Sequence, residues 1–336
     1  MSDSPSPSPS PSPPTPSPHT PVLYREVLEQ AGARAGELWV DCTLGRGGHA
    51  EGLLEAGVSL IGFDKDPDAL AFCARRLERF GDRFTPVHAD FRELTPRLSA
   101  LGVSAVDGVL ADLGVSSPQL DEAGRGFSFS ASGPVDMRMN PTAGPSAAEL
   151  IATLDEGALA RALHTYGEEP LARPIARALK AWSAAGGGDT LSLASAIEAA
   201  TPARVRYTLK KHPATRTFQA LRILVNDELG ALDDLISAAP PLLSPGGRLL
   251  VISFHSLEDR ALKVAFRALS EPPQPPRRGL PPPPGAAPSF EARPRKSIPP
   301  ADDELELNPR ARSAKLRVLR RLAAPSGLPA PSAPSA

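Results

Sequence analysis

The stretch Leu38-Trp-Val-Asp-Cys-Thr-Leu-Gly-Arg-Gly-Gly-His-Ala50 decides the fold of this chain. It opens with a short apolar run and continues into a loop that contains Gly45, Gly47 and Gly48. Continuous apolar runs of this length are typical of strands that are buried on both faces of a parallel sheet. We therefore predict a strand over residues 38–44, a glycine loop, and a helix that runs through Leu54.

The same alternation of strand and helix continues as far as Asp112. Pro67 opens a helix at its first position, and Asp66 before it is a suitable N-cap. Asp64 and Asp112 each stand at the end of an apolar run. This alternation predicts an α/β fold with a parallel, doubly wound sheet and right-handed crossovers. The further strands are predicted over residues 59–63, 84–89 and 106–111.

The alternation stops between residues 119 and 213, where helical patterns occur without a convincing strand. The strand signal returns over residues 247–254 and again over 315–319. The simplest account is a Rossmann-like domain with a helical insertion between its fourth and fifth strands. The clearest helices are predicted over residues 147–163, 191–200 and 217–238.

Proline content separates the folded part of the chain from two tracts. Residues 1–18 hold eight prolines and seven serines, and residues 271–300 hold twelve prolines. A segment with so few apolar residues cannot offset its ordering entropy by burial, so the first tract is predicted to be a disordered leader. The predicted domains are a Rossmann-like domain (19–122, 214–270 and 305–322), an inserted helical substrate-recognition domain (123–213), a proline-rich loop (271–304) and a disordered tail (323–336).

The composition favours a cytoplasmic protein without a membrane span. Residues 1–18 lack the apolar core of a secretory signal, and no run of about 18 apolar residues occurs. Cys42 and Cys73 are the only cysteines, so we expect reduced thiols and no cysteine-based zinc site. No other metal is required by the sequence.

The charge distribution points to a polyanionic partner, although the net charge is only −1. Residues 201–222 contain six Lys or Arg and no acid, and residues 308–321 contain six more and no acid. Each cluster alone is equally compatible with a solvated face. Two such clusters in one chain favour a partner such as a nucleic acid.

The glycine loop is suited to a nucleoside cofactor but does not identify it. Glycines allow close backbone approach, and the following helix N-terminus directs free N–H groups at a ligand. Asp64 ends the next strand, where a carboxylate can bind both ribose hydroxyls. Gly45, Gly47 and Ala50 also satisfy the dinucleotide pattern, so NAD and a purely structural turn remain alternatives. Asp41 favours S-adenosylmethionine, because it would repel a pyrophosphate and attract an ammonium group.

The sequence resembles a known family, and the match is most specific at Asp112. The stretch Asp112-Leu-Gly-Val-Ser-Ser-Pro-Gln-Leu-Asp121 is similar to one in the bacterial 16S rRNA cytosine-N4 methyltransferases, and further matches follow in family order over residues 19–322. The resemblance implies a class I methyltransferase sheet with an inserted helical domain. The other matching stretches are His19-Thr20, Gly45-Arg-Gly-Gly-His49, Arg125-Gly-Phe-Ser-Phe129, Asp136-Met-Arg-Met139, Thr165-Tyr-Gly-Glu168, His212-Pro-Ala-Thr-Arg-Thr-Phe-Gln219, Ser253-Phe-His-Ser-Leu-Glu-Asp-Arg260 and Asn308-Pro-Arg-Ala-Arg-Ser313.

The resemblance also implies which residues bind S-adenosylmethionine. A loop residue around the methionine portion, a ribose-binding acid, a residue beside the adenine and contacts near the reacting end all have counterparts here. Without the family, a phenylalanine after a strand is usually a core residue, and a histidine at a helix start can be a cap. The implied cofactor residues are Gly47, Gly48, His49, Asp64, Phe91, Asp112 and Gln119.

The chemistry implied is direct methyl transfer to the exocyclic nitrogen of a decoding-region cytidine. We expect Asp112 and backbone carbonyls of residues 113–118 to hold the amine and help to remove its proton. This loop contains no cysteine, which disfavours carbon-5 methylation through a thiolate adduct.

RNA contacts are expected from the first basic cluster and from one histidine. A target base must leave its stack to reach such a pocket, so side chains should grip the backbone around it. His255 is equally well explained as a structural residue at a strand end. The predicted RNA-binding residues are Arg204, Lys210, Lys211, His212, Arg216 and His255.

Three rival functions remain open from the sequence. An NAD-dependent dehydrogenase would leave the Asp112 motif unexplained, and a non-catalytic RNA assembly factor would not need an intact glycine loop with Asp64. A DNA cytosine-N4 methyltransferase usually carries Pro-Pro-aromatic after the acid, whereas Leu-Gly-Val follows Asp112. The expected partner is 16S rRNA or the small ribosomal subunit, with a homodimer as one option for the oligomeric state.

Overall fold

The computed structural model describes residues 21–271 and 288–323. The predicted leader (1–18), the His19-Thr20 match, half of the predicted proline-rich loop and nearly all of the predicted tail lie outside the described residues. None of the described helices is long and apolar enough to cross a membrane.

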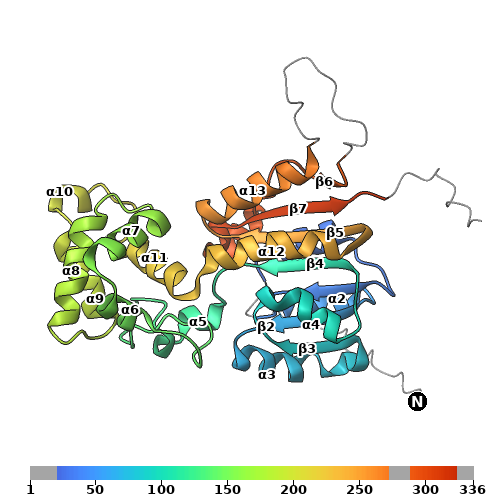
Figure 1. The fold of residues 1–336 in the computed structure, drawn as a ribbon, viewed down its shortest axis with the longest axis horizontal. Coiled ribbons are helices and arrows are strands. Elements are labelled where there is room, and N and C mark those ends of the chain that lie inside the picture. The colour runs from blue at the N-terminus through green and yellow to red at the C-terminus, as the bar shows by residue number, and fades with distance from the viewer. Residues whose placement is uncertain (1–20, 272–287, 324–336) are drawn as a thin grey trace, which may run out of the picture.

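A mixed sheet forms one half of the structure (Figure 1), in the strand order β3-β2-β1-β4-β5-β7-β6. The first five strands run parallel, and β7 joins β5 antiparallel. The predicted parallel, Rossmann-like α/β class is therefore confirmed. The strands are β1 (Leu38–Asp41), β2 (Ser59–Asp64), β3 (Phe84–His88), β4 (Val106–Asp112), β5 (Leu243–Ser253), β6 (Phe290–Ala292) and β7 (Lys315–Arg321).

Helices cover both faces of this sheet. Trp39, Leu60 and Leu110 point to one face, where they pack in a core with residues of the first three helices. Val40, Val109 and Val251 belong to the core on the other face. Because neighbouring residues of β1, β2 and β4 alternate between these cores, these three strands are largely apolar. The helices are α1 (Tyr24–Ala31), α2 (Gly48–Glu55) and α3 (Pro67–Arg76) on the first face, and α4 (Leu94–Ala100), α12 (Glu228–Leu242) and α13 (Ser256–Ser270) on the second.

The predicted helical insertion forms the other half of the structure (Figure 1). Its own core includes Phe127, Ile175 and Leu193, and also Phe218 and Leu221 of α11. A boundary after residue 213, as the sequence predicts, would divide this core. We therefore propose a boundary between α11 and α12. The helices are α6 (Ala147–Thr153), α7 (Glu156–Gly167), α8 (Ala172–Ala184), α9 (Thr190–Ala200), α10 (Ala203–Arg206) and α11 (Ala214–Asn226).

Two predicted helices are each divided in the structure. The helix expected over 217–238 breaks at Asp227, whose left-handed backbone (φ 46°) separates α11 from α12. The helix expected over 147–163 breaks before Asp155, which caps α7 by accepting a hydrogen bond from the Ala158 amide at 2.6 Å. The predicted loop over 271–304 was also wrong in part, because it includes β6 and the first residues of α14 (Asp302–Leu307). Short polar segments without a strong period hid both elements.

Candidate active site

Three acids meet where neighbouring strands end. Asp41 ends β1, Asp64 ends β2 and Asp112 ends β4, and β1 lies between the other two strands. The strands are parallel, so their carboxyl ends share one edge of the sheet, where ligands bind in open α/β folds. The sequence placed Asp64 and Asp112 at this edge, and the structure confirms that placement.

The glycine loop is bent tightly against α3. Gly47 has φ 70°, and a Cβ there would stand 2.9 Å from Sγ of Cys73. A Cβ at Gly48 would clash with the ring of Pro21. Both glycines are therefore required by the packing of the protein itself.

Asp64 is held by the loop that it faces. Its Oδ2 accepts a hydrogen bond from the Gly45 amide at 2.8 Å, and its Oδ1 accepts one from the Asp66 amide at 2.8 Å. Burial raises the pKa of Asp64, against the lowering effect of these two bonds. Each oxygen retains a second lone pair that can accept a hydroxyl hydrogen.

Asp112 is the least satisfied acid of the site. Its side chain is 26% exposed, yet its Oδ1 atom is buried without a hydrogen-bond partner among the described residues. Burial raises the pKa of Asp112 well above its usual range, and Asp41, Glu258 and Glu304 raise it further. Burial likewise raises the pKa of Asp41 to about 7. These strand-end acids form an acidic cradle, and a cation bound beside Asp41 and Asp112 would lower both pKa values.

His49 faces the same cradle from the second position of α2. Its Nδ1 lies 3.8 Å from Oδ2 of Asp112, and its Nε2 lies 3.0 Å from the carbonyl oxygen of Val22. Burial lowers the pKa of His49 to about 4. Both ring nitrogens are therefore directed at protein groups.

Segments from both ends of the described chain close this side of the site. The Leu23 amide donates a hydrogen bond to Oε1 of Glu304 at 2.8 Å, and Arg25 pairs with Asp303 at 2.7 Å. Both acids lie on α14. These contacts were not predicted, because the partners lie more than 270 positions apart in the chain.

Gln119 and Phe91 each make contacts within the protein. Gln119 is buried, its Oε1 accepts from the Ser116 amide at 2.9 Å, and its Nε2 donates to Oδ2 of Asp66 at 3.1 Å. Phe91 packs partly buried against the core beneath α4. Their cofactor roles stay predictions. In this structure Gln119 shapes the loop after Asp112, and Phe91 has the core role that is usual for a phenylalanine after a strand.

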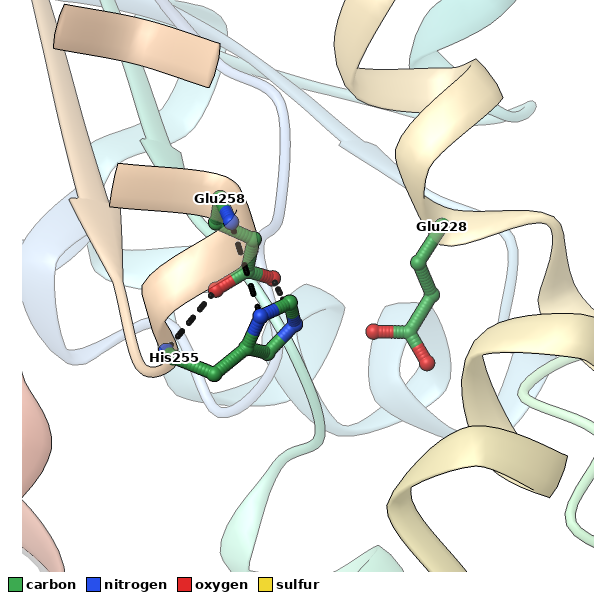
Figure 2. Close-up of side chains that lie close together, drawn as sticks. All are labelled: Glu228, His255 and Glu258. Carbon is green, nitrogen blue, oxygen red and sulfur yellow. Dashed lines mark hydrogen bonds and ion pairs between the residues drawn. The ribbon is translucent and has the colours of Figure 1, made fainter. Parts of the chain in front are cut away.

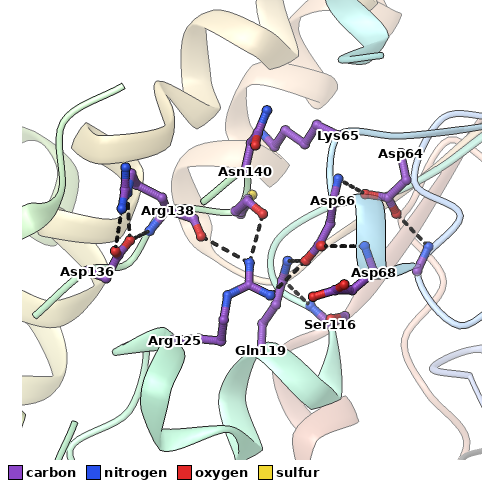
Figure 3. A network of polar contacts seen from close by, with 12 residues as sticks. Asp64, Lys65, Asp66, Asp68, Ser116, Gln119, Arg125, Asp136, Arg138 and Asn140 are labelled. Atoms are coloured by element: carbon purple, nitrogen blue, oxygen red, sulfur yellow. Dashed lines mark hydrogen bonds and ion pairs between the residues drawn. The ribbon is translucent and has the colours of Figure 1, made fainter. Parts of the chain in front are cut away.

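Arg125 connects the sheet half to the helical half (Figure 3). One of its nitrogens, Nη1, donates to Oδ2 of Asp66 at 2.8 Å, and Nη2 donates to the Met139 carbonyl at 2.8 Å. Asp66 is in turn the residue whose amide holds Asp64. The sequence singled out the Arg125 motif but not this function. A cavity of about 410 Å³ lies beside the network, lined by Lys65, His88, Ala89, Asp90, Glu93, Arg138, Asn140, Ala143, Val225 and Asn226.

Four of the residues predicted to bind RNA are exposed cations on and between α10 and α11 of the helical half (Figure 1). They are Arg204, Lys210, Lys211 and Arg216. His212 is different, because its Nδ1 accepts the Ala214 amide at 3.1 Å and its ring lies 4.9 Å from that of Phe129. The four cations thus belong to the exposed surface of this segment, and the His212 ring supports the start of α11.

His255 lies apart from that surface, at the start of α13 (Figure 2). Its side chain is 8% exposed, and its Nε2 lies 3.2 Å from Oε1 of Glu258, a contact without hydrogen-bond geometry. Its Nδ1 faces the Glu258 amide at 3.5 Å. The structure therefore favours the structural alternative for His255 over a grip on RNA.

Glu228, His255 and Glu258 offer ligand atoms within 4.8 Å of one another. Arg222, however, binds both oxygens of Glu228 at 2.7 Å. Glu258 Oε2 accepts the Phe254 amide at 2.8 Å. With Arg222 present the group is already close to charge balance, so we interpret it as an ion-pair cluster that joins α11, α12 and α13.

Comparisons with known proteins agree with this geometry. Residues 16–322 match the model of the MraW methylase family. A protein of Anaeromyxobacter sp. (strain K), named ribosomal RNA small subunit methyltransferase H, is 53% identical over 309 residues, which are 90% of this chain and 98% of that protein. Proteins of the same name from Myxococcus xanthus (strain DK1622) and Caulobacter vibrioides (strain NA1000 / CB15N) are 51% and 48% identical, over 90% and 91% of this chain and 97% and 96% of their own lengths.

Similarity to solved structures is far weaker. A putative methyltransferase from Streptococcus mutans, solved in complex with SAH, is 11% identical with a TM-score of 0.37, over 89% of this chain and 96% of that chain. A likeness at this level carries no further conclusion.

Proposed function

Because the chain belongs to the MraW methylase family, we propose that it methylates N4 of a decoding-region cytidine in the 16S rRNA of the small ribosomal subunit. S-adenosylmethionine is the methyl donor. The observation that carries the proposal is the acidic cradle at the sheet edge, in which Oδ1 of Asp112 is buried with no hydrogen-bond partner in the part of the chain that the structure describes.

The donor fits this cradle by charge. It carries an ammonium and a sulfonium, and the ends of β1, β2 and β4 present Asp41, Asp64 and Asp112. In the proposed arrangement, the backbone at Gly47 and Gly48 lies along the methionine portion and Asp64 binds the ribose. A dinucleotide pyrophosphate would meet repulsion from the same acids, so the NAD alternative is disfavoured.

The bound donor supplies an electrophilic methyl group, and the chain aligns the amine and removes its proton. The lone pair of N4 forms the new N–C bond, the C–S bond breaks with its electrons on sulfur, and an N–H proton passes to Asp112. Alignment of reacting groups contributes on the order of 7–11 kcal/mol, and a positioned base contributes roughly 10²–10⁴-fold in rate. Among the described residues, Asp112 is the group that we assign to the second role, because its Oδ1 atom is buried without a hydrogen-bond partner there.

The exposed cations supply the RNA side of the proposal. Arg204, Lys210, Lys211 and Arg216 bind phosphates and so hold the strand while the target base is turned out of its stack. Their contribution is sequence-independent and salt-dependent. The expected location is the cytoplasm, where small subunits are available. A homodimer stays a prediction that sedimentation velocity would test.

The decisive experiment offers labelled S-adenosylmethionine with unmethylated small subunits, naked 16S rRNA and DNA, followed by nucleoside mass spectrometry. We expect N4-methylcytidine in ribosomal RNA, and a loss of roughly 10²-fold or more in rate for Asp112→Asn with donor binding retained. Wild-type turnover by Asp112→Asn would remove the base from the mechanism. Donor binding without transfer to any RNA would favour an assembly factor instead.

A further inference from the structure

His49 and Asp112 form a buried pair that links α2 to β4. The His49 side chain is 6% exposed, and its Nδ1 lies 3.8 Å from Oδ2 of Asp112. The ring of Tyr24 stacks on that of His49, with centroids 6.2 Å apart and planes inclined by 24°. The imidazole plane is therefore fixed from α1 while one edge faces the carboxyl group.

The tautomer of His49 follows from its other nitrogen. Nε2 lies 3.0 Å from the Val22 carbonyl oxygen, and a carbonyl can only accept a hydrogen bond, so Nε2 carries the hydrogen. The neutral ring consequently directs the lone pair of Nδ1 at Asp112. A carboxyl group that faces such a lone pair is favoured in its protonated form.

The surroundings of the pair act in the same direction. Burial is the largest influence on the pKa of Asp112, and the charged groups that raise it further are Asp41 of β1, Glu258 of α13 and Glu304 of α14. Burial keeps His49 neutral, with its pKa at about 4. In the unliganded site, burial and the neighbouring acids therefore favour the protonated form of Asp112, and a neutral His49 ring faces it.

We propose that Asp112 and His49 form a pair that holds one proton. Asp112 loses this proton when the sulfonium form of the donor binds, and it takes up the proton that leaves the methylated amine. His49 is a positioning residue in this pair, because the lone pair of its Nδ1 faces the Asp112 carboxyl group from 3.8 Å. The uptake of a proton from the amine rests on the proposed function, whereas the loss of the proton on donor binding does not.

The proton balance closes over one cycle. Asp112 loses its proton to solvent when a positively charged sulfur stands in the cradle, because the charge favours the carboxylate. Asp112 gains a proton from N4 when the N–C bond forms and the C–S bond gives its electron pair to sulfur. With a neutral thioether in the site the carboxylate is no longer favoured, so Asp112 stays protonated beside His49. The enzyme thus returns to its starting state.

The test compares proton release on binding of S-adenosylmethionine and S-adenosylhomocysteine, which differ in the charge on sulfur. Titration calorimetry near pH 7, without RNA and in buffers of different ionisation enthalpy, measures the number of protons that are released on binding. We expect release of up to about one proton with the sulfonium ligand and markedly less with the thioether. Asp112→Asn should abolish the difference, and Asp41→Asn should retain it. Equal release with both ligands, or a difference that persists in Asp112→Asn, overturns the proposal.

Two histidine variants test the role of His49. His49→Gln can still donate to Val22 but presents nothing at the Nδ1 position, whereas His49→Asn presents an amide there. We expect the difference in proton release to shrink in His49→Gln and to be largely kept in His49→Asn. If both variants release protons as the wild type does and only bind the donor more weakly, His49 merely lines the loop. Because RNA is absent, these results stand whether or not cytidine N4 is the acceptor.

Discussion

The two basic clusters look alike in the sequence and serve different purposes in the structure. In the first, Arg204, Lys210, Lys211 and Arg216 are exposed. In the second, Arg310 pairs with Asp121 at 2.5 Å, Lys315 and Arg317 both bind Asp259 at 2.7 Å, and Arg321 donates to the Leu243 carbonyl. Six cations without an acid therefore predict a charged surface only where no distant acid folds onto them.

Position in the sheet explains the difference. The second cluster lies largely on β7, where Leu316 and Val318 fill one core and the alternate residues Lys315 and Arg317 face α13. Asp259 on that helix meets both cations. The first cluster lies on α10, on the turn after it and on α11. Among the described residues, its cations form two ion pairs, Arg206–Glu198 at 3.2 Å and Arg222–Glu228 at 2.7 Å.

Arg222 is the exception in the first cluster, and its removal should give the largest effect. Its side chain is 16% exposed and binds Glu228, which is 7% exposed. Arg222→Met should lower the free energy of unfolding by roughly 3–5 kcal/mol, because Glu228 is left unpaired beside Glu258. Chemical denaturation measures this, with Arg204→Met as the matched exposed control. Equal stability of the two variants would mean that the Arg222–Glu228 pair does not stabilise the fold.

Asp259→Asn should have the next largest effect, since it removes the acid that two cations of the second cluster share. We expect a loss of about 2 kcal/mol in unfolding free energy, less than for a fully buried pair because Lys315 is 44% exposed. RNA affinity should not change.

The pH dependence of this loss has a definite sign. Burial would raise the pKa of Asp259, but Lys315 and Arg317 hold it below its usual value. The stabilisation is therefore present above the unfolded-state pKa of about 3.9 and is lost as the pH falls through the folded-state value. The difference in unfolding free energy between wild type and Asp259→Asn should become smaller at acidic pH. A difference that grows there would contradict the pairing of Asp259 with Lys315 and Arg317.

Lys210→Glu/Lys211→Glu should weaken RNA binding by roughly tenfold or more at moderate salt and lower the salt slope by about two. Stability and donor affinity should be retained, because neither lysine has a structural partner among the described residues. Fluorescence anisotropy over a KCl series measures the change. Lys263→Glu/Arg267→Glu on α13 is a control with the same change in charge, and an equal loss there would mean that only net charge matters.

Removal of Arg312 should have the smallest effect on stability, because Arg312 is an exposed member of the second cluster. It is exposed on the short turn between α14 and β7, and no ion pair to it occurs among the described residues. Arg312→Ala should change the unfolding free energy by less than about 0.5 kcal/mol. If its salt slope for RNA also falls by about one, the second cluster contributes one phosphate contact. A large loss of stability would assign Arg312 to the internal group.

The sequence predicted the sheet well because its strands carry their signal locally. The apolar runs before Asp64 and Asp112 need no distant partner to be recognised, and the Asp66 cap of α3 was visible beside Pro67. The break at Asp227 was not predictable, because a left-handed backbone at a residue other than glycine is imposed by packing on both sides. The same holds for Arg125, Glu304 and Asp259, whose partners lie far away in the chain.

The contact between Leu23 and Glu304 has a consequence for synthesis. The segment that carries the Val22 carbonyl, the partner of His49, is made among the first residues, whereas α14 and β7 are made near the end of the described chain. The strand order further places β7 between β5 and β6, so the sheet is complete only after β7 has been synthesised. A nascent chain on a translating ribosome therefore carries the glycine loop and all three strand-end acids before it has a closed active site.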